Sequence, residues 1–340
     1  MSESRNETLP QRREVARPGA DHWQPTAEWP AVRLRADLLR RAREFFHEHQ
    51  FLEVETPLLS SETIVDAELE PIGVTIGENG ENEETFWLQT SPELCMKRLL
   101  SAGAKAIFQI TRGFRKEESG PLHNPEFTLM EWYRTGDGME EGMGLLSDLF
   151  QRLMQTNPAK RLSYRDAFLE YAQIDPFEAE PAAYAQIATA NGLAVPAQLG
   201  DEIDDWRNLL LLELVMPHLG QSEPVILFNY PASQAALAEI RNDPHPVAER
   251  FELFYQGIEL ANGYHELRDP HELRRRTEEA NRQRVAQGKR LLPPSRRLEA
   301  AMRAGFPRAA GVALGVDRLV LLAAGKKELA EVMTFPFDRA

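Results

Sequence analysis

Three glutamates recur at seven-residue intervals in one strand-like, apolar stretch of this sequence. The stretch is FELFYQGIELANGYHEL, and it carries Glu252, Glu259 and Glu266. The aromatic residues around them favour a buried sheet, where an unpaired carboxylate is costly and implies a bound cation. We therefore expect a cation site here; the alternative is a solvent-facing sheet surface with ordinary acidic residues.

The spacing predicts which of these glutamates come together. If Gln256-Gly257 is a two-residue hairpin turn, Glu252 pairs with Ala261, and Glu259 shares the same face two residues away. Two carboxylates placed as diagonal neighbours, roughly 7–8 Å apart at the backbone, are close enough to hold Mg²⁺ between them. A bulge or bend at Asn262-Gly263 then brings the third glutamate to the same cavity.

A polar loop between two strand-like runs holds an unusual mixture of side chains. In RKEESGPLHNPEF, Arg115 offers a guanidinium fork for bidentate binding of phosphate or carboxylate. Glu117 and Asn124 could bind the amine edge of a base, and Phe127 could stack on a flat ring. A solvated hairpin loop with surface ion pairs accounts for this loop about as well.

A third candidate lies where small residues run into an apolar helix. The run GVALGVDRL places Gly311, Ala313 and Gly315 where a backbone can approach a ligand closely. Arg318 begins the helix, an unusual position for a charge unless it meets an anion. Glycine-rich strand-to-helix sequence is common, so this run indicates a ligand site only in combination with the glutamate-containing stretch and the polar loop.

The elements that would position these residues indicate an α+β fold with an antiparallel sheet flanked by helices. Helical periodicity covers 31–50, and 271–290 is basic and amphipathic. Ser91 is expected to cap a helix with Pro92 at its first position and Glu93 in its first turn. Strand-like runs are mostly joined by hairpin-length connections; they are FLEVETPLLS, PIGVTI, TFWLQT, AIFQITRGF, EFTLMEWY, PVILFNYP, ERFELFYQ and GIELANGYHEL.

Composition limits the class of protein. The 340 residues, 42% of them apolar, are enough for a large domain, and 39 basic against 53 acidic residues give a net charge of −14. That balance argues against a protein held on nucleic acid by an overall positive field. The single cysteine excludes a disulfide framework, and no run approaches the roughly 18–20 apolar residues that span a bilayer. We expect a soluble, cytoplasmic protein with no membrane partner.

Together and in this order, the motifs resemble those of class II aminoacyl-tRNA synthetases, most closely the lysyl-tRNA synthetase catalytic core. FLEVETPLL is similar to motif 1, FRKEESGPLHNPEFTLMEWY to motif 2 and GVALGVDRL to motif 3, while RFELFYQGIELANGYHEL and SPEL…KRLL are similar to the lysine branch. The resemblance implies a class II fold, a homodimer, and a catalytic domain over residues 29–340 that follows a flexible extension, residues 1–28. It also implies ATP as a substrate and Mg²⁺ as a cofactor.

The resemblance implies residue roles as well. Arg115 would bind the ATP α-phosphate and the substrate carboxylate, and Arg318 would bind the γ-phosphate, which makes these two the catalytic residues. Glu252 and Glu259 would hold Mg²⁺, with Glu259 also at the nucleotide. The other implied ATP-binding residues are Lys116, Glu117, Asn124, Phe127, Leu260 and Gly315, and the implied lysine-binding residues are Ser91, Pro92, Glu93, Glu131, Tyr133, Asn262, Glu266 and Ala313.

Two departures from lysyl-tRNA synthetases resemble the elongation factor P–(R)-β-lysine ligases, which lack an anticodon-binding domain. Only some 30 extension-like residues precede motif 1, and Ala313 stands where the synthetases usually have glycine. A methylene-sized change in a pocket is typically worth about 1–3 kcal/mol of discrimination. His265 in GYHEL and the EWY of motif 2 also resemble these ligases. This resemblance implies adenylation of (R)-β-lysine, its transfer to a lysine of elongation factor P, and no stable tRNA binding.

Other interpretations remain open. A truncated lysyl-tRNA synthetase-like enzyme would acylate tRNA or another amine with α-lysine. An asparagine synthetase-type homologue would need cations where the sequence offers Glu93 and Glu266, and an inactive relic would be free to lose Arg115 and Arg318. Residues 274–290, with seven basic and two acidic residues, are either a docking face for an acidic partner or a solvated helix with internal ion pairs.

Overall fold

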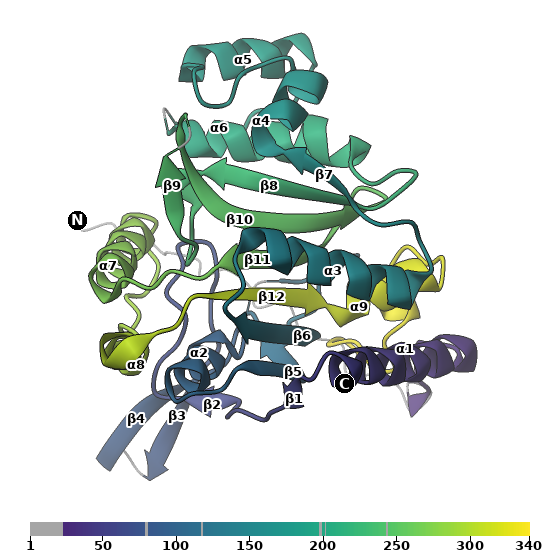
Figure 1. The fold of residues 1–340 in the computed structure, drawn as a ribbon, viewed down its shortest axis with the longest axis vertical. Helices are drawn as coiled ribbons and strands as arrows, with labels where there is room; N and C mark the ends of the chain where they lie inside the picture. The colour runs from purple at the N-terminus through teal and green to yellow at the C-terminus, as the bar shows by residue number, and fades with distance from the viewer. Residues whose placement is uncertain (1–22, 79–80, 117, 197–198, 201, 243) are drawn as a thin grey trace, which may run out of the picture.

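Two sheets form the centre of the computed structural model, which describes residues 23–78, 81–116, 118–196, 199–200, 202–242 and 244–340 (Figure 1). The larger sheet contains β1 (Leu52–Glu53), β5 (Ala106–Phe114), β6 (Glu126–Thr135), β7 (Lys160–Ser163), β8 (Val225–Pro231), β9 (Ile240–Asn242), β10 (Pro246–Tyr255), β11 (Ile258–His265) and β12 (Ala309–Gly315). The smaller sheet contains β2 (Leu59–Ser60), β3 (Gly73–Glu78) and β4 (Glu81–Leu88).

The strand order is β1-β5-β6-β12-β11-β10-β8-β7 in the larger sheet, where β9 also pairs with β10, and β2-β4-β3 in the smaller one. Every pairing is antiparallel except β1 with β5 and β7 with β8. The predicted antiparallel sheet is therefore present, with a parallel strand added at each end.

Helices pack around the larger sheet, as an α+β fold requires. The α-helices are α1 (Trp29–Glu48), α2 (Glu93–Ser101), α3 (Met139–Met154), α4 (Tyr164–Ala167), α5 (Pro181–Ala190), α6 (Ile203–Leu210), α7 (Pro270–Ala286), α8 (Arg296–Gly305) and α9 (Val316–Ala323). π-Helical turns at Phe168–Ala172 and Leu211–Val215 continue α4 and α6, and 3₁₀ turns span Met216–His218, Ala232–Gln234 and Leu329–Glu331. Within the residues described, no helix combines the length and apolarity needed to cross a membrane.

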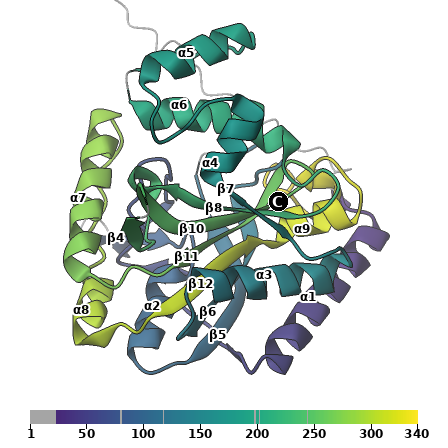
Figure 2. The ribbon, with the colours of Figure 1, turned by 45° about the horizontal axis from the view of Figure 1, so that its top comes forward.

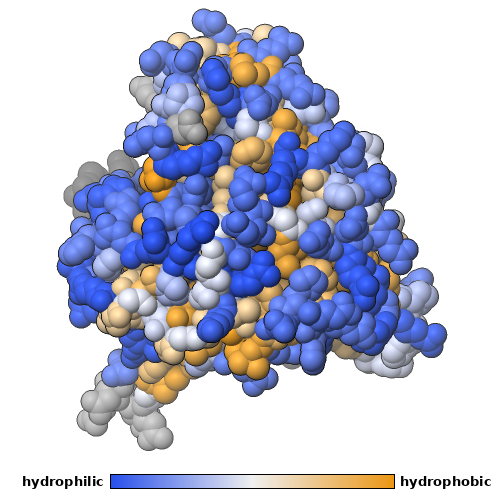
Figure 3. Space-filling view, in the orientation of Figure 1, coloured by the Kyte–Doolittle hydropathy of each residue, from blue (hydrophilic) through white to orange (hydrophobic). Residues whose placement is uncertain are grey.

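One face of the larger sheet packs on α1, α3 and α9 through a continuous apolar core. Met130 and Trp132 of β6 and Phe251 and Leu253 of β10 point into this core. Side chains alternate along a strand, so the residues between them point to the opposite face. α4 and α6 lie beyond β8, at the far end of the sheet from α1 (Figure 2). Figure 3 shows mostly hydrophilic side chains on the visible surface, with hydrophobic ones in separate patches.

Two local predictions are corrected by the fold. Residues 51–60 form two strands of two residues each, because β1 pairs with β5 of the larger sheet whereas β2 pairs with β4 of the smaller one. The segment around Pro57 therefore crosses between sheets. The predicted helix begins at Glu93 rather than Pro92, and the Ser91 hydroxyl accepts a hydrogen bond from the Glu93 N–H at 3.1 Å.

Other predicted elements are confirmed. The helix expected over 31–50 is α1, the helix expected over 271–290 is α7, and the runs at 71–76 and 85–90 overlap the antiparallel pair β3–β4. Residues 79 and 80, between these two strands, lie outside the described residues, as do residues 1–22 of the expected extension.

Arg284 ties α7 to the segment 66–70. Its side chain is fully buried, and Nη1 donates hydrogen bonds to the carbonyl oxygens of Asp66 at 2.9 Å and Leu69 at 2.7 Å. Nε donates to the Arg290 carbonyl at 2.9 Å, and Nη2 pairs with the Glu70 carboxylate at 2.6 Å. This single side chain therefore joins segments that are far apart in sequence.

Arg284→Met is expected to lower the free energy of unfolding by about 3–5 kcal/mol, because it leaves the partly buried Glu70 charge and several carbonyl oxygens without their partner. Urea denaturation measures this loss. The matched control is Arg282→Met on the same helix, since the Arg282 side chain is 65% exposed and pairs with Glu279, which is 45% exposed. Equal effects of the two substitutions would contradict the structural role of Arg284.

The basic residues of 274–290 are largely paired with acidic residues of this chain. This pairing favours a helix with internal ion pairs over a free docking face for an acidic partner. The pairs are Arg274 with Glu299, Arg275 and Arg276 with Glu272, Arg282 with Glu279, Arg284 with Glu70, and Lys289 with Glu68.

Candidate active site

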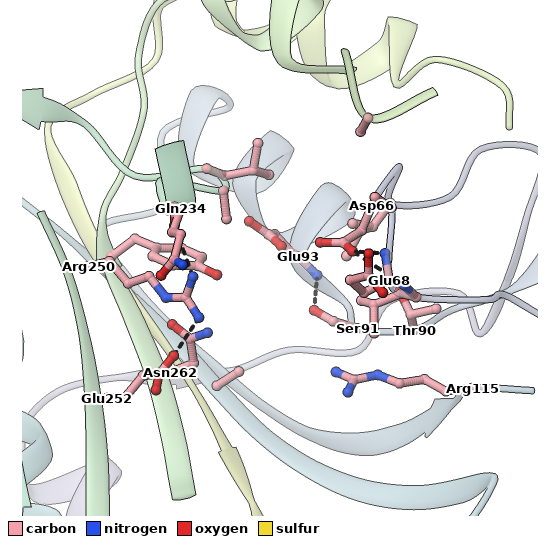
Figure 4. Close-up of a pocket in the computed structure, with 18 of the residues that line it drawn as sticks. Asp66, Glu68, Thr90, Ser91, Glu93, Arg115, Gln234, Arg250, Glu252 and Asn262 are labelled. Atoms are coloured by element: carbon pink, nitrogen blue, oxygen red, sulfur yellow. Dashed lines mark hydrogen bonds and ion pairs between the residues drawn. The ribbon is translucent and has the colours of Figure 1, made fainter. Parts of the chain in front are cut away.

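A cavity of about 1290 Å³ opens on the face of the larger sheet opposite α3 and α9. Ligand pockets commonly measure about 300–1,000 Å³, so this one has room for two ligands side by side. Figure 4 shows Arg115 on one side of this space, Arg250, Glu252 and Asn262 on the other, and Glu93 between them.

Most of the predicted site residues line this cavity. They are Ser91, Glu93, Arg115, Asn124, Phe127, Glu131, Tyr133, Glu252, Glu259, Leu260, Asn262, Glu266, Ala313, Gly315 and Arg318. Pro92 and Lys116 are not brought to it: Pro92 caps α2, and Lys116 is exposed, with its backbone N–H bound to the Glu70 carbonyl at 2.9 Å. Glu117 lies outside the described residues.

The β10–β11 hairpin brings the two predicted metal ligands to one wall, but its register differs from the prediction. Tyr255 pairs with Ile258 as expected. Glu252 pairs with Asn262 instead of Ala261, so the predicted register is wrong by one residue beyond the turn.

An extra residue in β11 causes this shift. Leu253 pairs with Ala261, and the next residue of β10, Phe254, pairs with Glu259. The intervening Leu260 has no partner in this ladder, which is the pattern of a β-bulge. The Glu259 side chain therefore lines the cavity on the same wall as Glu252, as predicted. The reason is the bulge at Leu260 and not the predicted register.

The bulge predicted at Asn262-Gly263 is absent, because both residues pair regularly with β10 and β12. A Cβ at Gly263 would lie within 2.9 Å of Phe251 and Val312 side-chain atoms, so packing explains this glycine. Glu266 reaches the cavity by simple alternation, four residues after Asn262.

Glu252 and Glu259 form a carboxylate pair beside Arg250, whose side chain is 21% exposed. Glu252 accepts a hydrogen bond from the Tyr230 hydroxyl at 2.5 Å and pairs with Arg250 at 2.5 Å. Partial burial and the nearby Glu252 carboxylate raise the pKa of Glu259, whose side chain stays 37% exposed to the cavity. Mg²⁺ is usually held by one or two carboxylates together with phosphate oxygens, and this pair fits such an ion.

Arg115 enters the cavity from the end of β5. Its Nη1 donates to Glu118 at 2.9 Å, and its guanidinium carbon lies 4.9 Å from the centre of the Phe127 ring. Its Nε is buried and has no hydrogen-bond partner among the residues described, which leaves a charged donor for a ligand. A Cβ at Gly113 would overlap the Phe127 ring, so this glycine lets the ring lie against β5.

Arg318 is the third residue of α9 rather than the first. Its Nη1 donates to the Glu259 carbonyl at 2.9 Å, its Nε to the Leu122 carbonyl at 3.2 Å, and its Nη2 to His123 Nε2 at 2.7 Å. Burial and the Arg318 charge lower the pKa of His123, so this histidine is a neutral acceptor. The guanidinium is thus held at the edge of the cavity near the carboxylate pair.

Asn124 has a bracing role in this structure. Its Nδ2 donates to the Glu126 carbonyl at 2.6 Å, and its Oδ1 accepts from the Phe337 N–H at 2.9 Å. These bonds fix the turn before β6 against the C-terminal segment. The side chain still borders the cavity, but its acceptor is already engaged.

A second cluster of carboxylates lies at the other end of the cavity. Glu131 accepts hydrogen bonds from the Tyr133 hydroxyl at 2.6 Å and from Ser91 Oγ at 2.7 Å. Burial and the nearby Glu93 carboxylate raise the pKa of Glu131 to about 7. Glu266 is only 1% exposed, and burial raises its pKa as well. Glu93, Glu131 and Glu266 together form what we call the acidic pocket.

Four residues of the site were not predicted. Lys97 follows Glu93 by four residues, a helical spacing that could have revealed the pair, and Arg250 precedes Glu252 by two on one strand face. His123 lies in the polar loop already singled out for Arg115. Tyr230 carries no sequence feature that places it beside Glu252.

The arrangement combines guanidinium groups, a carboxylate pair suited to Mg²⁺ and an acidic pocket in one cavity. Residues 28–339 match the family described as tRNA synthetases class II (D, K and N). Members of this family generally use ATP and Mg²⁺ to join an amino acid to an acceptor through an aminoacyl-adenylate. The match covers more than nine-tenths of the chain and agrees with the α+β fold around an antiparallel sheet. The chain therefore belongs to the class II tRNA synthetase family (D, K and N).

Proposed function

We propose that this protein activates (R)-β-lysine as an aminoacyl-adenylate and transfers it to a lysine side chain of elongation factor P. The observation that carries the proposal is the acidic pocket, which shares one cavity with Arg115. Carboxylates there suit an amino acid with two ammonium groups, and Arg115 suits its carboxylate and a phosphate.

The proposed first step needs little acid–base help. The amino-acid carboxylate attacks the α-phosphorus of ATP, a C–O–P linkage forms, and the bond to pyrophosphate breaks. Arg115 and Arg318 orient the phosphates and stabilise the developing negative charge. Mg²⁺, when held by Glu252 and Glu259, would supply further neutralisation of the phosphates. In the second step the acceptor amine attacks the acyl carbon, an amide forms and AMP leaves.

The outer wall of the cavity supports a cationic acceptor rather than RNA. It carries Asp66, Glu68 and Asp205, while its Arg275 and Arg276 are paired with Glu272. Phosphate groups would be repelled there, and a lysine ammonium would be attracted. The second candidate is a lysyl-tRNA synthetase-like enzyme that acylates tRNA or another amine with α-lysine.

The same proposal includes a homodimer in the cytoplasm, with residues 29–340 as the ligase domain. Leu52, in β1 at the edge of the larger sheet, is 65% exposed, and Leu58, directly before β2 at the edge of the smaller sheet, is 40% exposed. Apolar side chains at a sheet edge favour pairing with a second copy. Analytical ultracentrifugation tests this, since a monomer at micromolar concentration would oppose it.

Intact-mass spectrometry tests the acceptor. The protein is incubated with ATP and (R)-β-lysine in the presence of elongation factor P or of lysine tRNA. The proposal predicts one added β-lysyl group on elongation factor P, lost when the acceptor lysine is replaced by arginine. Acylation of tRNA with α-lysine, and an unmodified elongation factor P, would support the second candidate instead.

Ala313→Gly is expected to shift the ratio of kcat/KM values from β-lysine towards α-lysine by about 10-fold or more. Ala313 pairs with Glu131 on β6 and Asn262 on β11, and its methyl group faces the cavity. Removing the methyl reshapes the backbone wall beside the acidic pocket. Adenylation with both isomers in competition measures the ratio.

Ala310→Gly is the matched control, because Ala310 lies on the same strand with its side chain on the opposite face, near Gly142 of α3. It should leave the isomer ratio unchanged. An unchanged ratio in Ala313→Gly would remove Ala313 as the residue that discriminates between isomers.

A further inference from the structure

Lys97 is a buried cation behind the acidic pocket. It lies on α2, is 2% exposed, and is absent from the cavity lining, whereas both of its partners line the cavity. Its Nζ is 2.5 Å from Glu93 Oε1 and 2.5 Å from Glu266 Oε2. The ammonium therefore joins α2 to the end of β11 without reaching the space a ligand would occupy.

The position of Lys97 leaves free oxygen atoms for a ligand. It pairs with one carboxylate oxygen of each glutamate, and Glu266 Oε1 has no hydrogen-bond partner in the part of the chain that the structure describes. A buried oxygen without a partner is costly unless a ligand satisfies it. Glu266 borders the cavity, so an ammonium group bound there would supply the hydrogen bond that its buried carboxyl group lacks.

Packing around Glu266 prevents it from turning away. A Cβ at Gly311 would overlap both the Tyr133 ring and Glu266 Oε1, so these groups lie directly against the β12 backbone. Tyr133 is in turn fixed by its hydrogen bond to Glu131. With Lys97 on one side and the backbone on the other, Glu266 has little room to move.

The charges of this cluster match a diamino acid. Three carboxylates and one ammonium leave two net negative charges when all are ionised. A lysine isomer brings two ammonium groups, so the bound cluster is neutral. Without Lys97, a third buried carboxylate would lack a counter-charge, and a proton would be taken up instead.

We propose that Lys97 is a positioning residue of the amino-acid site, which bridges Glu93 and Glu266 and holds their carboxyl groups aligned for the ammonium groups of a diamino acid. This inference rests on the proposed activation of a lysine isomer. Although burial acts to lower it, the pKa of Lys97 is raised, because Glu266 and Glu93 stabilise the ammonium. The cation is therefore permanent across the physiological range.

The first test compares KM values in lysine-dependent ATP–pyrophosphate exchange. Lys97→Met is expected to raise KM for (R)-β-lysine by about 30-fold or more, the effect of truncating one member of a buried charge pair, while KM for ATP stays within about twofold. An unchanged KM for the diamino acid overturns the proposal. So does a parallel rise of both KM values, which indicates general disruption of the fold.

Chemical rescue keeps the test decisive if the loss of charge weakens the fold. Lys97→Ala is purified in n-propylammonium, which replaces the missing methylenes and ammonium, and is assayed as the amine is diluted. KM for the diamino acid should rise reversibly on dilution and should not respond to 1-propanol, the neutral control. A KM that ignores the amine overturns the proposal.

The wild-type protein separates this inference from the proposed function. If the wild type shows no exchange with any diamino acid, the proposed function fails, and the role of Lys97 fails with it. If the wild type exchanges and the Lys97 variants match it, only the role of Lys97 is lost.

Discussion

Arg115→Met is expected to lower kcat/KM for lysine-dependent adenylate formation by about 10²–10³-fold, the effect of removing one preorganised donor to developing charge. The guanidinium stands over Phe127 with a buried Nε that has no partner among the described residues, so it is available to an anion. Methionine keeps much of the side-chain length but neither the charge nor the donors. ATP–pyrophosphate exchange at subsaturating amino acid measures the loss.

Arg112→Met is the matched control for this prediction. Arg112 lies on β5, three residues before Arg115, but its side chain is 48% exposed; it donates a hydrogen bond to Thr128 at 3.0 Å and pairs with Glu126 at 3.5 Å. Its replacement should change exchange by less than about threefold, as expected for an exposed pair worth about 0–1 kcal/mol. Equal losses in the two variants would contradict the assignment of Arg115 to the reacting phosphate.

Glu131→Gln is expected to lower kcat/KM for the diamino acid by about 100-fold and to remove a pH dependence that the wild type should show. Below its pKa of about 7, Glu131 is neutral and cannot pair with an ammonium group. In the wild type, kcat/KM for the diamino acid should therefore fall as the pH is lowered through about 7. Exchange assays between pH 5.5 and 8.5, a range that brackets a pKa of about 7, measure this fall in kcat/KM, which we call the acidic limb.

Tyr133→Phe tests the same assignment through the direction in which the acidic limb of the pH profile moves. The Tyr133 hydroxyl donates to Glu131 and acts to lower its pKa, so its loss should move the acidic limb to higher pH. Glu126→Gln on the same strand is the control, because the Glu126 side chain is 49% exposed and pairs with Arg112. A limb that stays in place in Tyr133→Phe, or that survives in Glu131→Gln, would show that another group titrates.

Local sequence predicted the elements of the site better than the way they meet. Gln256-Gly257 was expected to form a two-residue turn, and both residues have positive φ values, 53° and 73°. The extra residue at Leu260 was not predicted, because a bulge depends on how β11 fits between β10 and β12. The same packing explains Gly263, which alternation alone could not distinguish from a bend.

The acidic pocket illustrates the same limit. The helix containing Glu93 was predicted, and a pair with Lys97 one turn later follows from helical geometry. The third member, Glu266, arrives from the end of β11, far along the chain, and only the sheet order sets that distance. Lys116 was assigned by resemblance, and the structure places it on the exposed side of its loop because that loop bonds to Glu70.

The most direct test of the account is ATP–pyrophosphate exchange with (R)-β-lysine, α-lysine and norleucine, each alone and then in competition. Norleucine keeps the length of lysine and lacks the second ammonium group. We expect exchange that requires both ammonium groups and favours the β isomer. Exchange supported equally by norleucine, or no exchange with any of the three, would contradict it.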